Sequence, residues 1–449
     1  MQGVACFPGM TGKKRCRCLC GWRYVTRMDI ETAVRSLLNQ VTPVPEREQV
    51  SLYHATGRIL AEEVRAPFAV PHFPKSAMDG YAVRSEDVQG ATPEHPVRLK
   101  VVGELLAGDD PAVCLKDSLY GQSPDGGTAV RIMTGAAVPE EYDAVVKQED
   151  TDYGDAVVTV RQGVSAYTNY CKVGEDIPEG SVVLTAGRRI GRIEAGVLAS
   201  LGIAEVTVVR PIRVSILSTG SELFSLSEPD PGAGNEKKKG IAAPAAGRIY
   251  NSIAYTLSAG LAGAGFTVTA GICPDDTEEI LRRLEEALKT SDIVITTGGV
   301  SVGKKDLLPE VLERAGAEQI FAGVDVQPGT PTIGSVKNGK VILSLSGNPY
   351  AALVNFDLYF WEVAAKLTGC EALLPVREEV ILGSEYPKKN RHRRLLRAKV
   401  TGNKVFLPAK SHASSVLSNL LDCNCYIDLP AGQEVAVGER VRILRMPGN

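Results

Sequence analysis

Acidic residues and glycine-rich turns occur together in the middle of this chain, in an arrangement that suits anion chemistry. An apolar, β-branched run from Ile293 to Ile295 is followed by the paired glycines Gly298 and Gly299, and the stretch closes with Asp306. The run predicts a buried strand, and the residues after Asp306 predict a helix over 307–315. A glycine-rich turn between a strand and a helix aims unpaired backbone N–H groups at one point, which suits a phosphate or another oxyanion.

Similar turns follow the other predicted strands of this region. The strands cover 214–218, 267–272, 292–297 and 341–345, and the turns after them carry Thr219, Gly220, Glu222, Asp275, Ser301, Ser346, Gly347 and Asn348. Ligands of open parallel sheets bind outside the carboxyl ends of the strands, so Glu222, Asp275 and Asp306 should converge on one edge. Carboxylates would repel an oxyanion unless a hard cation lay between them. The sequence therefore predicts a magnesium-bridged phosphate or oxoanion site in which these three acids are the metal ligands.

Some of the same residues also have structural interpretations. Asp276 with Glu279 fits a capping box, so we assign Asp276 to helix capping and Asp275 to function. Asp306 fits a helix cap as well as a metal ligand, and both interpretations stay open from these residues alone. The run from Gly298 to Lys304 matches the phosphate-binding pattern G-x-x-x-x-G-K. However, Lys305 stands where a nucleoside triphosphatase has its magnesium-binding Ser or Thr, which argues against that class.

A second candidate acid lies in an unusual loop nearer the N-terminus. The residues from Pro71 to Arg84 are too rich in proline and glycine for regular structure, yet they include Phe73, Met78 and Tyr81 around Asp79. An apolar loop with one central carboxylate is typical of a segment that packs while presenting that group. A solvated turn with Asp79 and Gly80 at its corner is the alternative. Thr134, at the end of a predicted strand, either donates its hydroxyl to a ligand or caps a turn.

The elements that must position these residues predict several domains, since 449 residues are too many for one core. Short alternating runs over 97–160 predict a small barrel or sandwich. Strands and helices that alternate between 214 and 368 predict a doubly wound parallel sheet, and the tail from 372 is again made of short strands. Helices are expected over 28–38, 52–61, 193–201, 253–264, 277–288, 307–315 and 351–368. The fold class is thus α/β and β, multidomain, with a hairpin at Lys337–Lys340.

Composition excludes some function classes. The net charge of −3 gives no electrostatic reason to expect nucleic acid, and no apolar run reaches the roughly 18 residues that span a bilayer. Cys16, Cys18 and Cys20 lack the spacing of a zinc site, so residues 1–27 are interpreted as an unstructured extension before Met28. The other cysteines are scattered, which favours the reduced cytoplasm. Residues 229–246 are expected to form a low-complexity surface insertion.

Six separated motifs resemble, in their order, those of the molybdopterin molybdenumtransferases of the MoeA and gephyrin E-domain type. They are Ser76-Ala-Met-Asp-Gly-Tyr-Ala82, Arg131-Ile-Met-Thr-Gly-Ala136, Gly174-Glu-Asp-Ile177, Ser218-Thr-Gly-Ser-Glu-Leu223, Thr297-Gly-Gly-Val-Ser-Val-Gly303 and Gly347-Asn-Pro349. The resemblance implies an elongated homodimer of four-domain chains. Domain I would comprise 28–73 and 174–209, domain II 74–173, the molybdopterin-binding domain III 210–371, and the small β-barrel-like domain IV 372–449.

The resemblance also implies a reaction and its site. The reaction is Mg2+-dependent insertion of molybdate into adenylylated molybdopterin with release of AMP, and molybdopterin adenylyltransferase would be the upstream donor. The acidic set falls on Asp79, Asp176, Glu222, Asp275 and Asp306, with Thr134 as a polar partner. The dimer partner's surface is expected to complete the cleft. Substrate contacts are expected from Thr219, Gly220, Gly298, Gly299, Ser301, Lys304, Ser346, Gly347, Asn348, Arg397 and Ser414.

The chain departs from the family pattern at three motifs, and in one of them Lys304 stands where an acidic residue usually follows the Gly303 equivalent. Gln327-Pro-Gly-Thr-Pro331 stands where members often have Lys-Pro-Gly-Lys-Pro, and Leu345-Ser-Gly-Asn-Pro-Tyr-Ala351 replaces Leu-Pro-Gly-Asn-Pro-Val-Ser. The lost lysines favour an alternative in which the protein is a scaffold that binds molybdopterin without inserting metal. A further alternative is an insertase that prefers tungstate. If the protein does insert molybdate, Lys304, Lys305 or Arg397 would supply the positive charge that the two lysines provide in other members.

Overall fold

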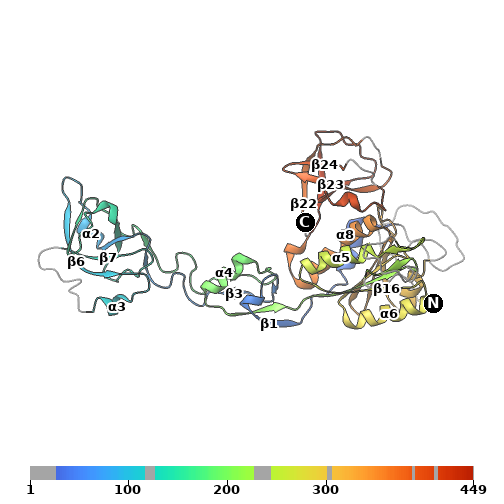
Figure 1. The fold of residues 1–449 in the computed structure, drawn as a ribbon, viewed down its shortest axis with the longest axis horizontal. Helices are drawn as coiled ribbons and strands as arrows, with labels where there is room; N and C mark the ends of the chain where they lie inside the picture. Colours follow the sequence, from blue (N-terminus) through green and yellow to red (C-terminus); the bar gives the residue numbers. More distant parts are fainter. Residues whose placement is uncertain are drawn as a thin grey trace, which may run out of the picture. The chain divides into compact units, whose positions relative to one another are not determined.

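A computed structural model describes residues 27–116, 127–226, 244–300, 306–386, 390–408 and 413–447. The chain separates into two compact units (Figure 1). One, here called the inserted unit, is the continuous segment Arg47–Val209, and the segments before and after it form the other, here called the flanking unit. The finer division into four domains stays a prediction.

A six-stranded sheet forms the centre of the flanking unit. Its order is β16 (Thr267–Cys273), β13 (Arg213–Thr219), β17 (Ile293–Thr297), β21 (Lys340–Leu345), β20 (Ile333–Lys337) and β18 (Glu318–Ala322). The first four are parallel, as predicted. The centres of β13, β17 and β21 are buried, whereas the edge strand β16 is buried only at Cys273. The last two run antiparallel, and β18 was not predicted. Asn338 and Gly339 have φ of 51° and 76° in the predicted hairpin between β20 and β21, which suits a tight primed turn.

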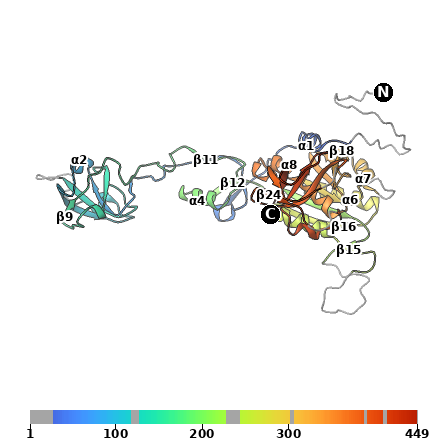
Figure 2. The ribbon, with the colours of Figure 1, turned by 90° about the horizontal axis from the view of Figure 1, so that it is seen from above.

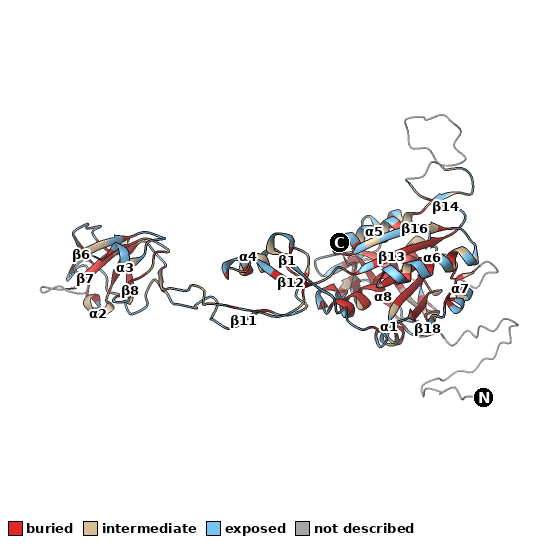
Figure 3. Ribbon diagram, turned by 90° about the horizontal axis from the view of Figure 1, so that it is seen from below, coloured by how far each residue is buried: buried red, intermediate tan, exposed pale blue. Residues whose placement is uncertain are grey.

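Helices cover both faces of this sheet. The helices α6 (Thr277–Thr290) and α7 (Leu308–Arg314) share a core with Leu217, Val294 and Ile342 of the strands. On the other face α5 (Ser252–Gly263) packs on β13 and α8 (Pro349–Thr368) on β21, and α8 is buried on nearly all sides (Figure 3). The helix α1 (Ile30–Leu38) contacts α8 and begins two residues later than predicted, because Asp29 is its N-cap.

The tail of the flanking unit closes into a small barrel (Figure 2). Its strands follow one another around the barrel in the order β22 (Arg377–Leu382), β26 (Arg440–Arg445), β25 (Cys425–Leu429), β23 (Arg393–Thr401) and β24 (Lys404–Phe406). Pairing between β23 and β25 joins neighbouring strands, and pairing between β22 and β24 completes the closed barrel. The short strand β19 (Val326–Gln327) adds to β23. The remaining bounds are η3 (Glu371–Leu373) and η4 (Ser418–Leu420). The expected β-rich domain IV character is confirmed.

The inserted unit is built from small sheets. The largest has the order β8 (Ala144–Lys147), β5 (Gly80–Val83), β7 (Thr128–Ile132), β6 (Val97–Leu105) and β9 (Val157–Val160). A second has the order β1 (Arg47–Ser51), β12 (Glu205–Val209) and β2 (Ile59–Leu60). Two-stranded sheets pair β3 (Val64–Arg65) with β11 (Val182–Leu184), and β4 (Lys75–Ser76) with β10 (Tyr170–Cys171). The helical elements are α2 (Ser85–Val88), α3 (Pro111–Cys114), α4 (Arg192–Ser200), η1 (Leu52–His54) and η2 (Gln148–Asp150).

The helix predicted over 52–61 is wrong. A single 3-10 turn, η1, is followed by Gly57 with φ of 83°, and β2 then pairs with β12 through Leu60 and Ile59. The helical spacing of apolar residues was misleading because these residues fill a core around β12.

The chain leaves and re-enters the flanking unit at one place. The backbone N–H of Arg210 donates to the carbonyl of Glu46 at 3.2 Å. The guanidinium of Arg210 donates to both carboxylate oxygens of Asp292, at 2.7 and 2.8 Å. These bonds fix the start of β13 against the start of β17.

None of the helices in the described part of the chain has the length and apolar content needed to cross a bilayer.

Candidate active site

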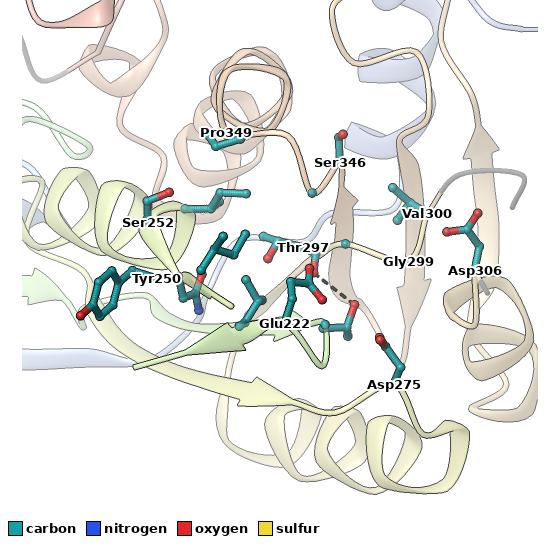
Figure 4. Close-up of a pocket in the computed structure, with 18 of the residues that line it drawn as sticks. Glu222, Tyr250, Ser252, Asp275, Thr297, Gly299, Val300, Asp306, Ser346 and Pro349 are labelled. Atoms are coloured by element: carbon teal, nitrogen blue, oxygen red, sulfur yellow. Dashed lines mark hydrogen bonds between the residues drawn. The ribbon is translucent and has the colours of Figure 1, made fainter. Parts of the chain in front are cut away.

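A pocket of about 320 Å³ lies at the carboxyl ends of the parallel strands (Figure 4). All four predicted strand-end turns contribute to it. The predicted residues that line it are Thr219, Gly220, Glu222, Asp275, Gly298, Gly299, Asp306, Ser346 and Gly347. The structure therefore brings these nine residues to one site, as predicted from the parallel strands, whose carboxyl ends meet at one edge of the sheet.

Glycines allow the strand-end turns to pack backbone against backbone. Gly298 has φ of 90°, and a Cβ there would lie 2.5 Å from the carbonyl oxygen of Thr219. Gly347 packs on the same glycine from the turn after β21, since its Cβ would lie 3.5 Å from the Gly298 Cα. The Thr219 hydroxyl donates to the carbonyl of Thr297 at 3.2 Å. The floor of the pocket is thus closely packed backbone, which a ligand's phosphate can approach.

The three acids reach the pocket from different elements (Figure 4). The Glu222 carboxylate lies against Gly220, 2.7 Å from where a Cβ of that glycine would be. Asp275 accepts from the backbone N–H of Ser221 at 3.1 Å, and both acids are exposed. Asp306 is half-buried at the side formed by Gly299 and Val300. The N-cap position of α7 falls on Leu307, whose backbone is itself helical, so both interpretations of Asp306 stay open.

Asp276 has the structural role that was assigned to it. It is the N-cap of α6, and its side chain accepts from the backbone N–H of Glu279 at 2.8 Å. Two neighbouring aspartates thus differ in surroundings, because Asp276 holds a helix while Asp275 faces the pocket.

A single ion held by all three acids does not fit this arrangement. Within the described ranges, no group of three or more His, Cys, Asp or Glu side chains is placed to hold a metal ion. Mg2+ commonly binds through only one or two carboxylates and completes its shell with substrate phosphates and water. The exposed Glu222 and Asp275 fit that second kind of site.

One wall of the pocket was not predicted from the sequence. Tyr250, Asn251 and Ser252 line it where α5 begins, and Pro331 lines it from the segment that departs from the family pattern. Asn251 is the N-cap of α5 and accepts from the backbone N–H of Ala254 at 3.3 Å. Because Pro349 at the start of α8 also lines the pocket, two helix N-termini border it, and their dipoles favour an anion. The Asn-Ser pair before the predicted helix was the available sequence signal.

The inserted unit contains a preorganised carboxylate of its own. Asp79 accepts from the backbone N–H of Thr134 at 2.7 Å and from its hydroxyl at 2.6 Å. These hydrogen bonds hold the pKa of Asp79 below its ordinary value. Asp79 and its predicted polar partner are therefore brought together, whereas Asp176 is an exposed residue of a separate turn. Thr134 lies in the turn after β7 and orients the acid.

The remaining predicted contacts have mixed outcomes. Ser301, Lys304 and Lys305 lie outside the described residues. Asn348 is the N-cap of α8, and its backbone N–H donates to the Ser346 hydroxyl at 3.2 Å. Arg397 has a buried side chain and is not among the residues that line this pocket, so its contact with substrate stays a prediction. Its guanidinium donates to the backbone carbonyls of Ala413 and Val416.

Comparison with known families gives three matches in chain order. Residues 28–202 match the MoeA N-terminal region (domain I and II), residues 215–366 match a probable molybdopterin binding domain, and residues 379–446 match the MoeA C-terminal region (domain IV).

Individual relatives match over most of their length. The chain is 35% identical to a molybdopterin molybdenumtransferase of Bacillus subtilis over 416 residues, 91% of each chain. It is 33% identical to one of Staphylococcus epidermidis over 414 residues, which is 91% of this chain and 92% of the relative. The crystal structure of the molybdopterin biosynthesis moeA protein of Pyrococcus horikoshii superposes with a TM-score of 0.77 at 27% identity, covering 94% of this chain and all of that one. The chain therefore belongs to the MoeA family of molybdopterin molybdenumtransferases.

Proposed function

We propose that this protein is a molybdopterin molybdenumtransferase of molybdenum cofactor biosynthesis, with molybdate and molybdopterin as substrates. In the finer form of the proposal, molybdate is inserted into adenylylated molybdopterin and AMP is released. The observation that carries it is the pocket at the strand ends, where glycine turns, two helix N-termini and three acids meet.

The pocket's own groups suit an anionic substrate. Backbone N–H groups at the glycine turns and the N-termini of α5 and α8 would hold the phosphate oxygens. Glu222 and Asp275 would hold Mg2+ together with a phosphate oxygen, since isolated carboxylates beside that oxygen would repel it. Bound Mg2+ would supply neutralisation of charge on the phosphate that leaves. Both acids then act as ligands and positioners.

Two positions that often hold lysines in the family carry no charge in this chain. Gln327 is exposed, and the Thr330 hydroxyl donates to the backbone carbonyl of Val326 at 2.7 Å. The two positions that often hold lysines in the family thus carry a solvated amide and a turn-stabilising hydroxyl. Weaker attraction for the oxoanion is the expected consequence, because each lost lysine removes one favourable charge.

The direct test is AMP release by the purified protein. It is incubated with adenylylated molybdopterin and Mg2+, and with molybdate, tungstate or neither. Release that requires molybdate supports the proposal, and release only with tungstate would identify the other oxoanion as substrate. Tight binding of the adenylylated pterin without release in any arm would instead favour the scaffold alternative.

Neighbouring aspartates provide a matched pair of variants. Asp275→Asn should lower the rate of AMP release about 100-fold, a loss typical of removing one preorganised charged contact. Asp276→Asn should leave the rate unchanged, because Asn is as good an N-cap as Asp. Both variants should keep the wild-type melting temperature. Equal rates of AMP release in the two variants would show that Asp275 has no role in the reaction.

The homodimer and the supply of substrate by molybdopterin adenylyltransferase belong to the same proposal. Sedimentation equilibrium of the purified protein measures whether it is a homodimer.

Mixed dimers of Asp79→Asn with Asp275→Asn test whether acids of two copies serve one reaction. If they do, some mixed dimers carry one site in which Asp79 and Asp275 are both unchanged. Recovery of AMP release on mixing is expected, and its absence would restrict the site to one chain.

A further inference from the structure

Tyr350 occupies an unusual position at the start of helix α8. It directly follows the pocket residues Ser346, Gly347 and Pro349, and its side chain is buried. Its hydroxyl reaches strand β23 of the barrel, where it donates to the carbonyl of Leu395 and accepts from the backbone N–H of Arg397, both at 2.7 Å. One side chain thus links the edge of the pocket to the barrel.

Arg397 is held in turn by the ring of Tyr350. The centre of its guanidinium lies 3.9 Å from the ring centroid, a cation–π contact. Two guanidinium nitrogens donate to the backbone carbonyls of Ala413, at 2.6 Å, and Val416. The Arg397 Nε is buried and has no hydrogen-bond partner among the described residues. Because burying unpaired donors is costly, the two bonds to 413–416 are the ones that offset the burial of this guanidinium.

The same segment also contacts the backbone of Tyr350. The carbonyl of Ser414 accepts from the Tyr350 N–H at 3.2 Å, a donor that has no partner within the first turn of a helix. The 413–416 segment is therefore docked on the first turn of α8 by the backbone, ring and hydroxyl of one tyrosine, and by the arginine stacked on it.

We propose that Tyr350 is a positioning residue that, together with the arginine stacked on its ring, docks the 413–416 segment beside the pocket turn Ser346–Pro349, so that segment and turn are fixed before substrate binds. The family pattern has valine at this position, which can supply neither the aromatic face nor the hydroxyl. The effect of this docking on the reaction rests on the proposed function. Preorganised positioning of substrate contacts lowers the cost of binding.

Hydrogen exchange of the full-length protein tests the docking without any substrate. In Tyr350→Val, exchange at the amides of 413–416 should rise about tenfold, because local opening becomes easier when buried contacts are lost. Tyr350→Phe keeps the ring and should give a smaller rise. Tyr386→Phe is the matched control, since it deletes another buried tyrosine hydroxyl of the barrel, bonded to Asn390 at 2.9 Å. Exchange of 413–416 that is the same in Tyr350→Val, Tyr350→Phe and wild type would overturn the docking.

Kinetics separate positioning from simple stability. For AMP release at saturating molybdate, KM for adenylylated molybdopterin should rise about tenfold in Tyr350→Val with little change in kcat. Tyr350→Phe should recover much of that loss, and Tyr386→Phe should equal wild type. A uniform loss of active protein, with KM unchanged, would overturn the positioning role. If wild type releases no AMP, the proposed function fails, while hydrogen exchange still decides the docking.

Discussion

Asp357 is a buried acid that the proposed chemistry does not use. In helix α8 its carboxyl group accepts from the Tyr426 hydroxyl at 2.7 Å and from the Trp361 indole N–H at 3.1 Å. Burial raises its pKa to about 7, and the two donors only partly offset that effect. The folded protein therefore keeps this acid protonated at pH values where the unfolded chain has already ionised it.

The consequence is a pH-dependent free energy of unfolding. The stabilisation is complete below the unfolded pKa near 3.8 and falls as pH rises to the folded value of about 7. Asp357→Asn removes the titration, so the pH dependence of its free energy of unfolding should be flatter across this window. Urea unfolding at several pH values measures it. Parallel curves for the variant and wild type would show that the folded carboxyl is not protonated.

Among elements, the glycine turn after β17 fixes the shape of the pocket. Gly298→Ala should lower the free energy of unfolding by about 2 kcal/mol or more and abolish AMP release, because the new Cβ meets the Thr219 carbonyl at positive φ. Gly260→Ala provides the matched control inside α5, where a Cβ meets nothing within 4 Å. It should stabilise by about 0.5–1 kcal/mol with normal activity. Equal stability of the two variants would contradict this account.

The elements also show what sequence reasoning can and cannot reach. Strand-end turns such as those of Asp275 and Gly298 were predictable, because parallel strands deliver their carboxyl ends to one edge. Tyr250 and Pro331 were missed, since neither follows a strand of that sheet. The resemblance and the charge of Arg397 led to its assignment to substrate, whereas its stacking on Tyr350 is a long-range contact that the sequence does not show. The helix expected over 52–61 failed for the same reason, since pairing with β12 overrode the local pattern.

For the whole molecule, the division into two compact units has a direct test. Joining Glu46 to Arg210 through a short glycine-serine turn, in place of the inserted unit, should leave a folded chain that still binds AMP. The N–H and carbonyl of these residues are already 3.2 Å apart, so closure needs little rearrangement. Calorimetry should show one of the two unfolding transitions expected of the full chain, and calorimetric titration measures AMP. An excised chain without cooperative unfolding would show that the flanking unit depends on the inserted one.

The meeting of Glu46 and Arg210 also bears on ancestry. The two ends of the inserted unit join the flanking unit at adjacent residues. Recombination at two points can therefore add, remove or exchange such a unit, here called the guest, while the backbone of the flanking unit, here called the host, keeps its course. The pocket and the barrel would be inherited together in the host. The Asp79–Thr134 pair would be inherited with the guest, so the two sets of acids could follow separate histories.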